Sequence, residues 1–300
     1  MNGPRLVVFD TASLYFRAFF GLPGTLRALD GRPVNAVRGL LDFIARLTTQ
    51  YSPTHLACAW DEDWRPAWRV DLVPTYKAHR VAQGDEEVVP DDLSAQVPLI
   101  LDVLDALGIP VIGATGFEAD DVLGTLAERF PGEVFVVTGD RDLFQVADDR
   151  VKVLYVGRGV ARHEVVDADW VLARYGIPAD RYVDFAVLRG DPSDGLPGVP
   201  GIGEKSAAQL IVRYGDIDGI VAAASDPSSG MAPGLRSKVA AAVGYLGAAR
   251  EVVRVASDLD VPLPHPIEGG RVDRARFDAL TTELQLGGPA VRVLAALGVR

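Results

Sequence analysis

Five carboxylates lie in two short clusters of this 300-residue chain, and their types and spacing could bind a metal ion. The first cluster consists of Glu118, Asp120 and Asp121, and the second of Asp140 and Asp142. An apolar run at 134–137 precedes the second cluster and predicts a β-strand, whose last residue points to the edge where open α/β sheets place their sites. Like charges gathered at one edge repel each other unless a cation lies between them. Oxygen ligands favour hard ions such as Mg²⁺ or Mn²⁺.

A simpler interpretation remains open for the first cluster, because acidic residues also stabilise the N-terminus of a helix, here the one expected at 122–130. Two more aspartates follow apolar runs, Asp10 after 6–9 and Asp61 after 55–60. A lone surface aspartate at a strand end is common. A strand ending in Asp also begins haloacid-dehalogenase-type phosphatases, but these need a second Asp where this chain has Ala12.

The segment 64–92 mixes aromatic and basic side chains, including Trp68, Arg69, Tyr76, Lys77 and Arg80. Such a mixture suits a segment that contacts phosphates and stacks on bases. An ordinary surface loop with solvated charges explains the composition equally well.

A turn-rich stretch at 197–205 leads into an expected helix that has Lys205 and Ser206 in its first turn. Its glycines, Gly198, Gly201 and Gly203, let the backbone approach a phosphate closely. Amide groups at a helix start then face the anion. Just before it, Asp191 and Asp194 add two more carboxylates.

The elements that must position these residues form an alternating pattern. Strands are expected at 6–9, 55–60, 110–112, 134–137 and 151–155, and helices at 12–20, 35–50, 92–107 and 122–130. Two short helices are expected within 166–188, a loop at 222–233, and helices at 235–257, 274–286 and 290–297. The pattern predicts an α/β lobe at 1–189, with a mainly parallel sheet flanked by helices, and a helical lobe at 190–300.

Composition sets few limits on function. A chain with 48% hydrophobic residues can form a packed core. Its single cysteine, Cys58, fits a reducing compartment, and no apolar run is long enough for a signal peptide or a membrane span, so we expect a cytoplasmic, nucleoid-associated protein. Taken alone, the net charge of −11 disfavours a nucleic-acid partner. Without the nine carboxylates named above, however, that balance of −11 becomes −2.

The order of these motifs across the whole chain resembles the 5′-nuclease (flap endonuclease) superfamily, in particular the N-terminal domain of bacterial DNA polymerase I. The resemblance rests on strand–Asp10, strand–Asp61, the 117–121 and 138–142 motifs, 190–194 and the hairpin at 198–203. It implies a PIN-like 5′-nuclease fold with a helical arch at about 64–92 and a helix-hairpin-helix motif at about 190–214. A free-standing 5′-nuclease is therefore expected.

The resemblance also implies roles for individual residues. One divalent ion would be bound by Asp10, Asp61, Glu118 and Asp120, and a second by Asp140, Asp142 and Asp194, with Asp121 and Asp191 contributing directly or through water. Lys77, Arg80, Asp120 and Asp140 are the expected catalytic residues. DNA contacts are expected from Arg17, Arg69, Tyr76, Lys77, Arg80, Gly198, Gly201, Gly203, Lys205 and Ser206, and a K⁺ ion from the backbone of Val199 and Ile202.

The expected activity is hydrolysis of branched, nicked or 5′-ended DNA, or of RNA primer–DNA hybrids, by a monomer that uses two or three Mg²⁺ or Mn²⁺ ions. Two ions can together activate a water, polarise the phosphate and stabilise the leaving oxygen. Two alternatives remain: a PIN-like ribonuclease and a catalytically silent DNA-binding protein. The long segment after Gly190 disfavours the first, and the complete carboxylate set disfavours the second.

Overall fold

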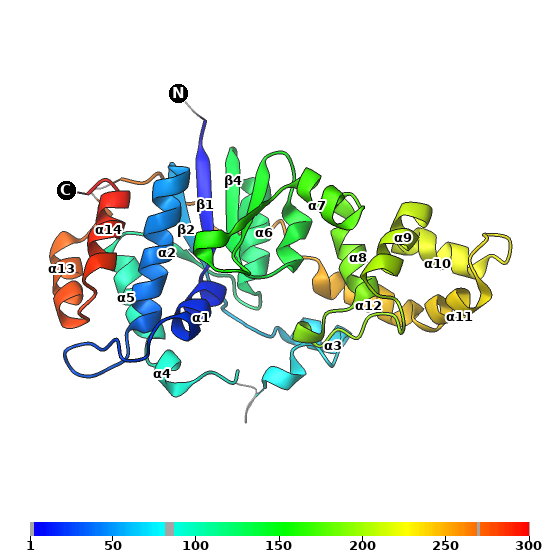
Figure 1. Ribbon diagram of the computed structural model, residues 1–300, viewed down its shortest axis with the longest axis horizontal. Helices are drawn as coiled ribbons and strands as arrows, with labels where there is room; N and C mark the ends of the chain where they lie inside the picture. The colour runs from blue at the N-terminus through cyan, green and yellow to red at the C-terminus, as the bar shows by residue number, and fades with distance from the viewer. Residues whose placement is uncertain (1–2, 82–86, 269–270, 300) are drawn as a thin grey trace.

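The computed structural model describes residues 3–81, 87–268 and 271–299, and a six-stranded sheet lies at its centre (Figure 1). The strand order is β3-β2-β1-β4-β5-β6, and neighbours are parallel except for β5 and β6. The strands are β1 Arg5–Asp10, β2 His55–Ala59, β3 Val111–Ile112, β4 Glu133–Thr138, β5 Val151–Tyr155 and β6 Glu164–Val166. The expected α/β class with a mainly parallel sheet is confirmed.

Helices cover both faces of the sheet, as the alternation of side chains along β1 requires. On one face Val7 and Phe9 pack with α1 (Thr11–Gly21), α2 (Asn35–Tyr51) and α5 (Val97–Ala106). On the other face Leu6 and Val8 pack with α6 (Ala119–Arg129). The helix expected at 92–107 is two pieces, α4 (Asp91–Ser94) and α5, with Pro98 in the first turn of the second. Proline has no N–H to continue a helix, but it fits a helix start.

A helical lobe extends from the sheet on the right of Figure 1. Its helices are α7 Ala168–Tyr175, α8 Tyr182–Arg189, α9 Glu204–Tyr214, α10 Ile217–Ser225, α11 Pro233–Ala241 and α12 Val243–Val253. Two expectations are wrong here. The single helix expected at 235–257 is instead α11 and α12, of which the second ends at Val253, because the Ala242 N–H donates to the Val239 carbonyl and closes a tighter turn between them. The loop expected at 222–233 begins only after α10 ends at Ser225.

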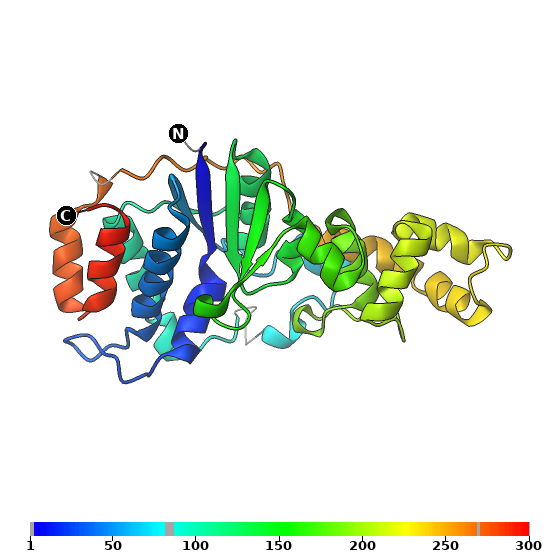
Figure 2. The same cartoon turned by 45° about the horizontal axis from the view of Figure 1, so that its top comes forward.

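The last two helices do not belong to the helical lobe, so the expected boundary of 190–300 is wrong. Both α13 (Arg274–Glu283) and α14 (Gly288–Ala296) lie beside α2 and α5 at the opposite end of the molecule (Figures 1 and 2). Phe277 and Val293 are completely buried in the same core cluster as the α2 face. Composition cannot predict that α13 and α14 return to the α/β lobe, because an amphipathic helix does not specify which apolar face it will cover.

The arch region begins with α3 (Ala67–Leu72) and a short helical turn at Ala78–Arg80. Part of the expected arch, 82–86, lies outside the described residues. Within the part of the chain that the structure describes, every helix is too short or too polar to cross a membrane.

Replacing Phe277 by alanine should lower the free energy of unfolding by about 3–5 kcal/mol, because it removes a fully buried ring and leaves a cavity between α13 and the α/β lobe. Urea unfolding followed by circular dichroism measures this change. Val291→Ala on α14 is the matched control, since Val291 is 68% exposed and should change stability by less than about 0.5 kcal/mol. Equal stability of the Phe277 variant and the wild type would contradict the packing of α13.

Candidate active site

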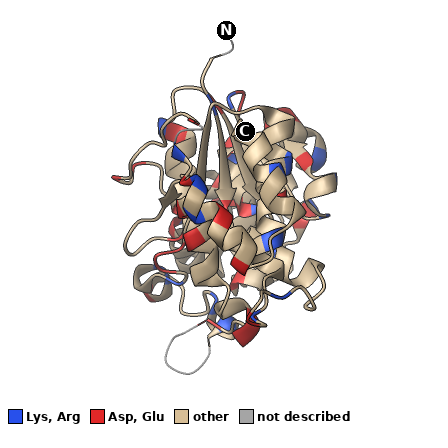
Figure 3. Ribbon diagram, turned by 90° about the vertical axis from the view of Figure 1, so that its left-hand side faces the viewer, with Lys and Arg blue, Asp and Glu red and all other residues tan. Residues whose placement is uncertain are grey.

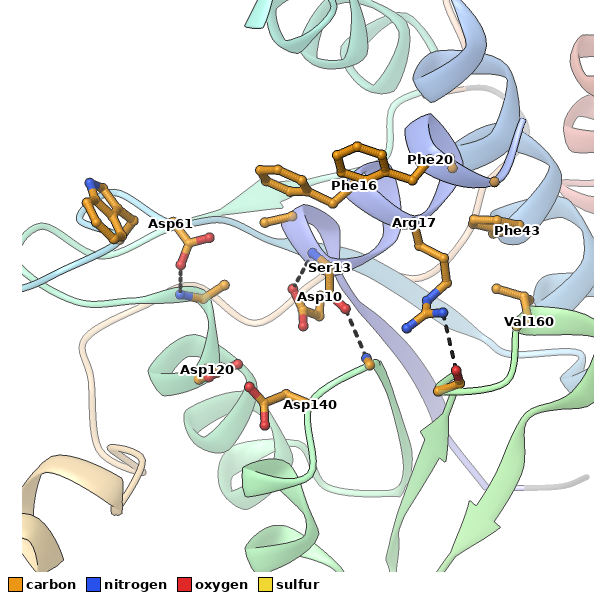
Figure 4. Close-up of a pocket in the computed structure, with 18 of the residues that line it drawn as sticks. Asp10, Ser13, Phe16, Arg17, Phe20, Phe43, Asp61, Asp120, Asp140 and Val160 are labelled. Carbon is orange, nitrogen blue, oxygen red and sulfur yellow. Dashed lines mark hydrogen bonds between the residues drawn. The ribbon is translucent and has the colours of Figure 1, made fainter. Parts of the chain in front are cut away.

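The carboxyl ends of β1, β2 and β4 bring three of the predicted aspartates together. Asp10 ends β1, Asp61 follows β2, and Asp140 follows β4. They line a cavity of about 1120 Å³ that is also lined by Glu118 and Asp120 of the loop and first turn at the start of α6. Figure 3 shows acidic segments at the ends of the strands, and Figure 4 shows Asp120 and Asp140 next to each other below Asp10. Five of the nine predicted carboxylates therefore line one cavity at this edge of the sheet, and their binding of metal stays a prediction.

Asp10 is held in place by the elements that surround it. Its Oδ1 accepts a hydrogen bond from the Ser13 N–H (3.1 Å), which caps α1, and its Oδ2 accepts one from the Thr138 hydroxyl (2.6 Å) at the end of β4. Burial raises the pKa of Asp10 to about 7, and the negative charges of Asp61 and Asp140 add to this increase. A cation bound nearby would favour the ionised form of Asp10.

Asp120 and Asp142 show the same lack of compensating positive charge. Burial raises the pKa of Asp120 and that of Asp142 well above the ordinary value, and the charge of Asp140 adds to both shifts. The Asp142 N–H donates to Asp140 Oδ1 (2.8 Å). Asp142 Oδ1 is buried and has no hydrogen-bond partner. A buried carboxylate oxygen without a donor is costly, and a bound cation would satisfy it.

Glu118, in contrast, is already surrounded by donors. Its carboxylate accepts hydrogen bonds from the Lys77 ammonium (2.5 Å) and the Tyr76 hydroxyl (2.9 Å), and Arg69 Nη1 lies 3.2 Å from Oε1. The backbone N–H of Lys77 also donates to the Asp194 carbonyl (2.9 Å), so Lys77 lies between Glu118 and Asp194.

The expected roles of Asp121, Arg69 and Tyr76 need correction. Asp121 points away from the cavity and forms a two-pronged ion pair with Arg69, at 2.8 and 2.9 Å. Arg69 is 2% exposed and Tyr76 is 4% exposed, so neither side chain forms part of a surface that DNA can reach. The residue types of the segment 64–92 predict contact with phosphates. In the structure, however, the side chains of Arg69 and Tyr76 are packed into the protein interior.

Asp191 and Asp194 lie on the other side of Lys77. Asp194 Oδ1 accepts a hydrogen bond from Arg80 (2.8 Å), and Asp191 Oδ1 accepts bonds from the N–H and hydroxyl of Ser193. Both aspartates belong to a turn after α8. The charges of Asp140 and Asp191 add to the burial that raises the pKa of Asp194. Arg80 lines the main cavity together with Lys77, as expected of a residue that faces substrate.

The donor set fits hard divalent ions. Oxygen ligands line the cavity, the desolvated carboxylates lack sufficient positive charge, and Asp142 has a free buried oxygen. Among residues 3–81, 87–268 and 271–299, however, no three potential ligands are arranged closely enough to hold an ion. Two of the expected ligands are bonded to protein donors instead: Asp61 accepts from the Ala119 N–H (2.8 Å), and Glu118 accepts from Lys77.

The glycine-rich hairpin has the backbone geometry that its sequence predicts. Gly198 and Gly201 have φ values of 67° and 76°, which favour glycine, and Gly203 caps α9. The side chains of Val199 and Ile202 are buried, whereas Gly201, Gly203 and Lys205 are exposed. The Ile202 N–H donates to the Val199 carbonyl (2.9 Å), which closes the turn. The backbone of the hairpin thus faces outward beside the basic Lys205.

The cavity has an aromatic wall that was not predicted from the sequence. Phe16 and Phe20 on α1 and Phe43 on α2 line it beside Arg17 (Figure 4). Phe20 is 71% exposed, which is unusual for such a large apolar side chain. Phe16, Arg17 and Phe20 follow Asp10 at helical spacing, so this signal was available in the sequence. Glu87 also lines the cavity.

In the absence of metal, the stability of the chain should fall as pH rises from about 4 to 7. Burial raises the pKa of Asp10 from its ordinary value of 3.8 to about 7 in the folded chain, so in this range the folded chain binds a proton that the unfolded chain has released. The free energy of unfolding should decrease by a few kcal/mol and stay low above pH 7. Thermal unfolding in EDTA from pH 5 to 8 measures this decrease.

Asp10→Asn should reduce this dependence of stability on pH. The dependence that remains should come from the other carboxylates whose pKa values are raised. Added Mn²⁺ should flatten the dependence, because a cation favours the ionised forms. Unfolding temperatures that do not change with pH in EDTA would contradict the uncompensated burial of Asp10.

Comparisons with known proteins agree with this geometry. Residues 5–176 match the family model of the 5′-3′ exonuclease N-terminal resolvase-like domain, and residues 177–275 match that of the 5′-3′ exonuclease C-terminal SAM fold. A 5′-3′ exonuclease of Streptomyces coelicolor is 52% identical over 97% of this chain and 99% of its own. One of Mycobacterium tuberculosis is 56% identical over 89% of this chain and 88% of its own.

The polymerase resemblance is also confirmed. DNA polymerase I of Mycobacterium bovis is 42% identical over 73% of this chain, a match that spans 24% of the polymerase. Among solved structures, the bacteriophage T5 D15 flap endonuclease, in a pseudo-enzyme-product complex with DNA and metal ions, has a TM-score of 0.67. It is 16% identical and covers 98% of this chain and 99% of its own, which establishes a shared fold. From the family models and these relatives, we conclude that the chain belongs to the 5′-3′ exonuclease family and is a nuclease.

Proposed function

We propose that this nuclease hydrolyses phosphodiester bonds near the 5′ ends of branched or nicked DNA, both as an exonuclease and as a flap endonuclease, and that it depends on divalent metal ions. The observation that carries the proposal is the cavity at the strand ends, where desolvated carboxylates meet the cationic side chains of Lys77 and Arg80. The names of the two exonuclease relatives and the DNA-bound T5 flap endonuclease support the choice of substrate.

The carboxylates divide into two proposed metal sites, one formed by Asp10, Asp61, Glu118 and Asp120 and the other by Asp140, Asp142 and Asp194, with Asp191 beside the second. Mg²⁺ or Mn²⁺ ions bound there would polarise the phosphate, activate a water molecule and stabilise the leaving oxygen. Asp121 is not among the proposed ligands, because both of its oxygens are engaged by Arg69.

The chain's own residues would bind and orient the substrate. Lys77 and Arg80 supply positive charge beside the carboxylates and would hold the phosphate that is cut. The aromatic wall of Phe16, Phe20 and Phe43 offers apolar surface on which bases can stack. Arg17 supplies a further cation on the same side of the cavity. Together these groups suit a single-stranded 5′ end rather than an uninterrupted duplex.

The hairpin of the helical lobe would bind the duplex part of the substrate. Outward-facing backbone at Gly201 and Gly203, with Lys205 and Ser206 in the first turn of α9, fits the phosphates of one strand. A K⁺ ion bound by the Val199 and Ile202 backbone would strengthen this contact. The chain would act as a monomer in the cytoplasm, and RNA primers paired with DNA would also be substrates.

The test uses a 5′-labelled flap duplex with the intact chain in Mg²⁺, in Mn²⁺ and in EDTA. The expected result is a product cut near the junction in either metal and no product in EDTA. A matched single strand and an uninterrupted duplex should be cut more slowly. Tight binding of the flap with no product in either metal would overturn the proposal and would favour a silent DNA-binding protein. Cleavage confined to RNA would instead favour a PIN-like ribonuclease.

A further inference from the structure

Arg69 connects three parts of the chain that are distant in sequence. It belongs to α3 at the base of the arch region, and its guanidinium donates to Asp121 in α6 at 2.8 and 2.9 Å. Its Nε donates to the carbonyl of Val252, the penultimate residue of α12 in the helical lobe (3.1 Å). The indole of Trp68 lies against the guanidinium, 4.6 Å from its carbon to the ring centroid. Its Nε and both terminal nitrogens are therefore bonded to groups inside the protein.

Asp121 completes the connection. Oδ1 also accepts a hydrogen bond from the N–H of Ala256, just after α12 (2.9 Å), and Oδ2 accepts one from the N–H of Glu118 (3.1 Å). The backbone of the proposed metal ligand Glu118 is thus held by Asp121, while its carboxylate lies 3.2 Å from Arg69 Nη1. A displacement of the pair would move Glu118 and the first turn of α6, which carries Asp120.

We propose that Arg69 and Asp121 are positioning residues: they fix the start of α6, and with it the proposed ligands Glu118 and Asp120, against the arch base and the helical lobe. The inference rests on the proposed function and adds to it a link between the helical lobe, which would bind the duplex, and the metal site. Figure 1 shows α3 next to α12, on the side of α6 that faces the helical lobe.

The location of the pair rules out a direct role in binding DNA. Arg69 is 2% exposed and Asp121 is 1% exposed. Groups that hold metal ligands from behind typically change metal affinity or activity by about 10- to 100-fold when they are replaced. Arg69→Gln should therefore weaken Mn²⁺ binding, measured by isothermal titration calorimetry of the DNA-free chain, by about 10- to 100-fold.

The same variant should bind a labelled flap duplex in EDTA within about threefold of the wild type, because the exposed hairpin and the cavity cations remain. Arg69→Lys should restore only part of the Mn²⁺ affinity, since an ammonium cannot reproduce a two-pronged pair. In cleavage assays at saturating Mn²⁺, the Arg69→Gln loss should appear mainly in kcat rather than in KM.

Breaking a buried pair can also unfold a protein, because one charge is left uncompensated. A second variant, Arg69→Met with Asp121→Leu, removes both charges and keeps the volume nearly unchanged, so it should fold. It should still show the reduced Mn²⁺ affinity, because the hydrogen bonds to Glu118 N, Ala256 N and the Val252 carbonyl are lost.

Arg250→Gln is the matched control. Arg250 also lies on α12 and pairs with a buried aspartate, Asp184 (3.0 Å), but this contact lies within the helical lobe. It should lower thermal stability without changing the affinity for Mn²⁺. Wild-type Mn²⁺ affinity in the folded double variant would overturn the positioning role. Loss of flap binding in EDTA that matches the loss of cleavage would also overturn it. A wild-type chain that binds no Mn²⁺ would instead overturn the proposed function.

Discussion

Asp140→Asn should reduce cleavage of a flap duplex by on the order of 10³-fold or more, although the variant differs from the wild type by little more than one charge. Asp140 lies beside Asp120 just after β4 (Figure 4), and its Oδ1 also accepts a hydrogen bond from the Asp142 N–H, so it adjoins ligands of both proposed metal sites. An amide oxygen carries no formal charge and would not balance a divalent ion. Single-turnover cleavage in saturating Mg²⁺ measures the loss.

DNA binding separates this effect from misfolding. In EDTA the variant should bind the flap at least as tightly as the wild type, because one negative charge facing the phosphates has been removed. Asp149→Asn is the matched control, since Asp149 is an exposed carboxylate in the loop beyond the cavity. It should cleave like the wild type. Undiminished cleavage by Asp140→Asn would show that the carboxylates at the strand ends are not the catalytic centre.

Lys77→Met should reduce the single-turnover rate by about 10²- to 10³-fold, as the loss of one group that stabilises developing charge typically does. The Lys77 ammonium is bonded to Glu118 at 2.5 Å and to the Trp64 carbonyl at 3.2 Å, and its side chain lines the cavity. The methionine side chain keeps the length of lysine without its charge, so the change tests electrostatics rather than packing.

Lys77→Arg should recover part of the activity, because it keeps the charge in a wider group. The control is Lys152→Met, since Lys152 pairs with Glu133 (2.9 Å) at the opposite end of β4 and lines no part of the cavity. A pH–rate profile adds a further readout. Burial lowers the pKa of Lys77 and the charge of Glu118 raises it, and the net shift is upward. Lys77 therefore stays protonated through neutral pH. Wild-type rates in Lys77→Met would contradict its placement beside the reacting phosphate.

Much of the fold and of the carboxylate site could be predicted from the sequence. Apolar runs that end in Asp10, Asp61 and Asp140 fixed the parallel strands, because a buried parallel sheet needs side chains that are apolar on both faces. Since the carboxyl ends of such strands meet at one edge, the grouping of carboxylates followed without any knowledge of contacts. The hairpin could be predicted for a similar reason, since positive φ at Gly198 and Gly201 depends on residue type.

The direction of individual side chains could not be predicted in the same way. Arg69 and Lys77 have similar sequence surroundings, yet one is buried against Asp121 and the other lines the cavity. Asp120 and Asp121 are neighbours in the chain, but successive residues of a helix point about 100° apart, so Asp120 lines the cavity while Asp121 pairs with Arg69. The return of α13 and α14 was equally hidden, because it depends on which apolar surface near α2 is left uncovered. Such outcomes are decided by long-range packing.

The return of α13 and α14 also has a mechanical consequence. Both ends of the chain attach to the α/β lobe, the N-terminus through β1 and the C-terminus through α14 beside α2 (Figure 1). The helical lobe begins after β6 and ends after α12. It is therefore an insertion whose two ends both connect to the α/β lobe. Tension applied to the two termini would pass through β1, the sheet and the α2–α14 contact. The lobe that carries the hairpin would bear no load until α14 had detached.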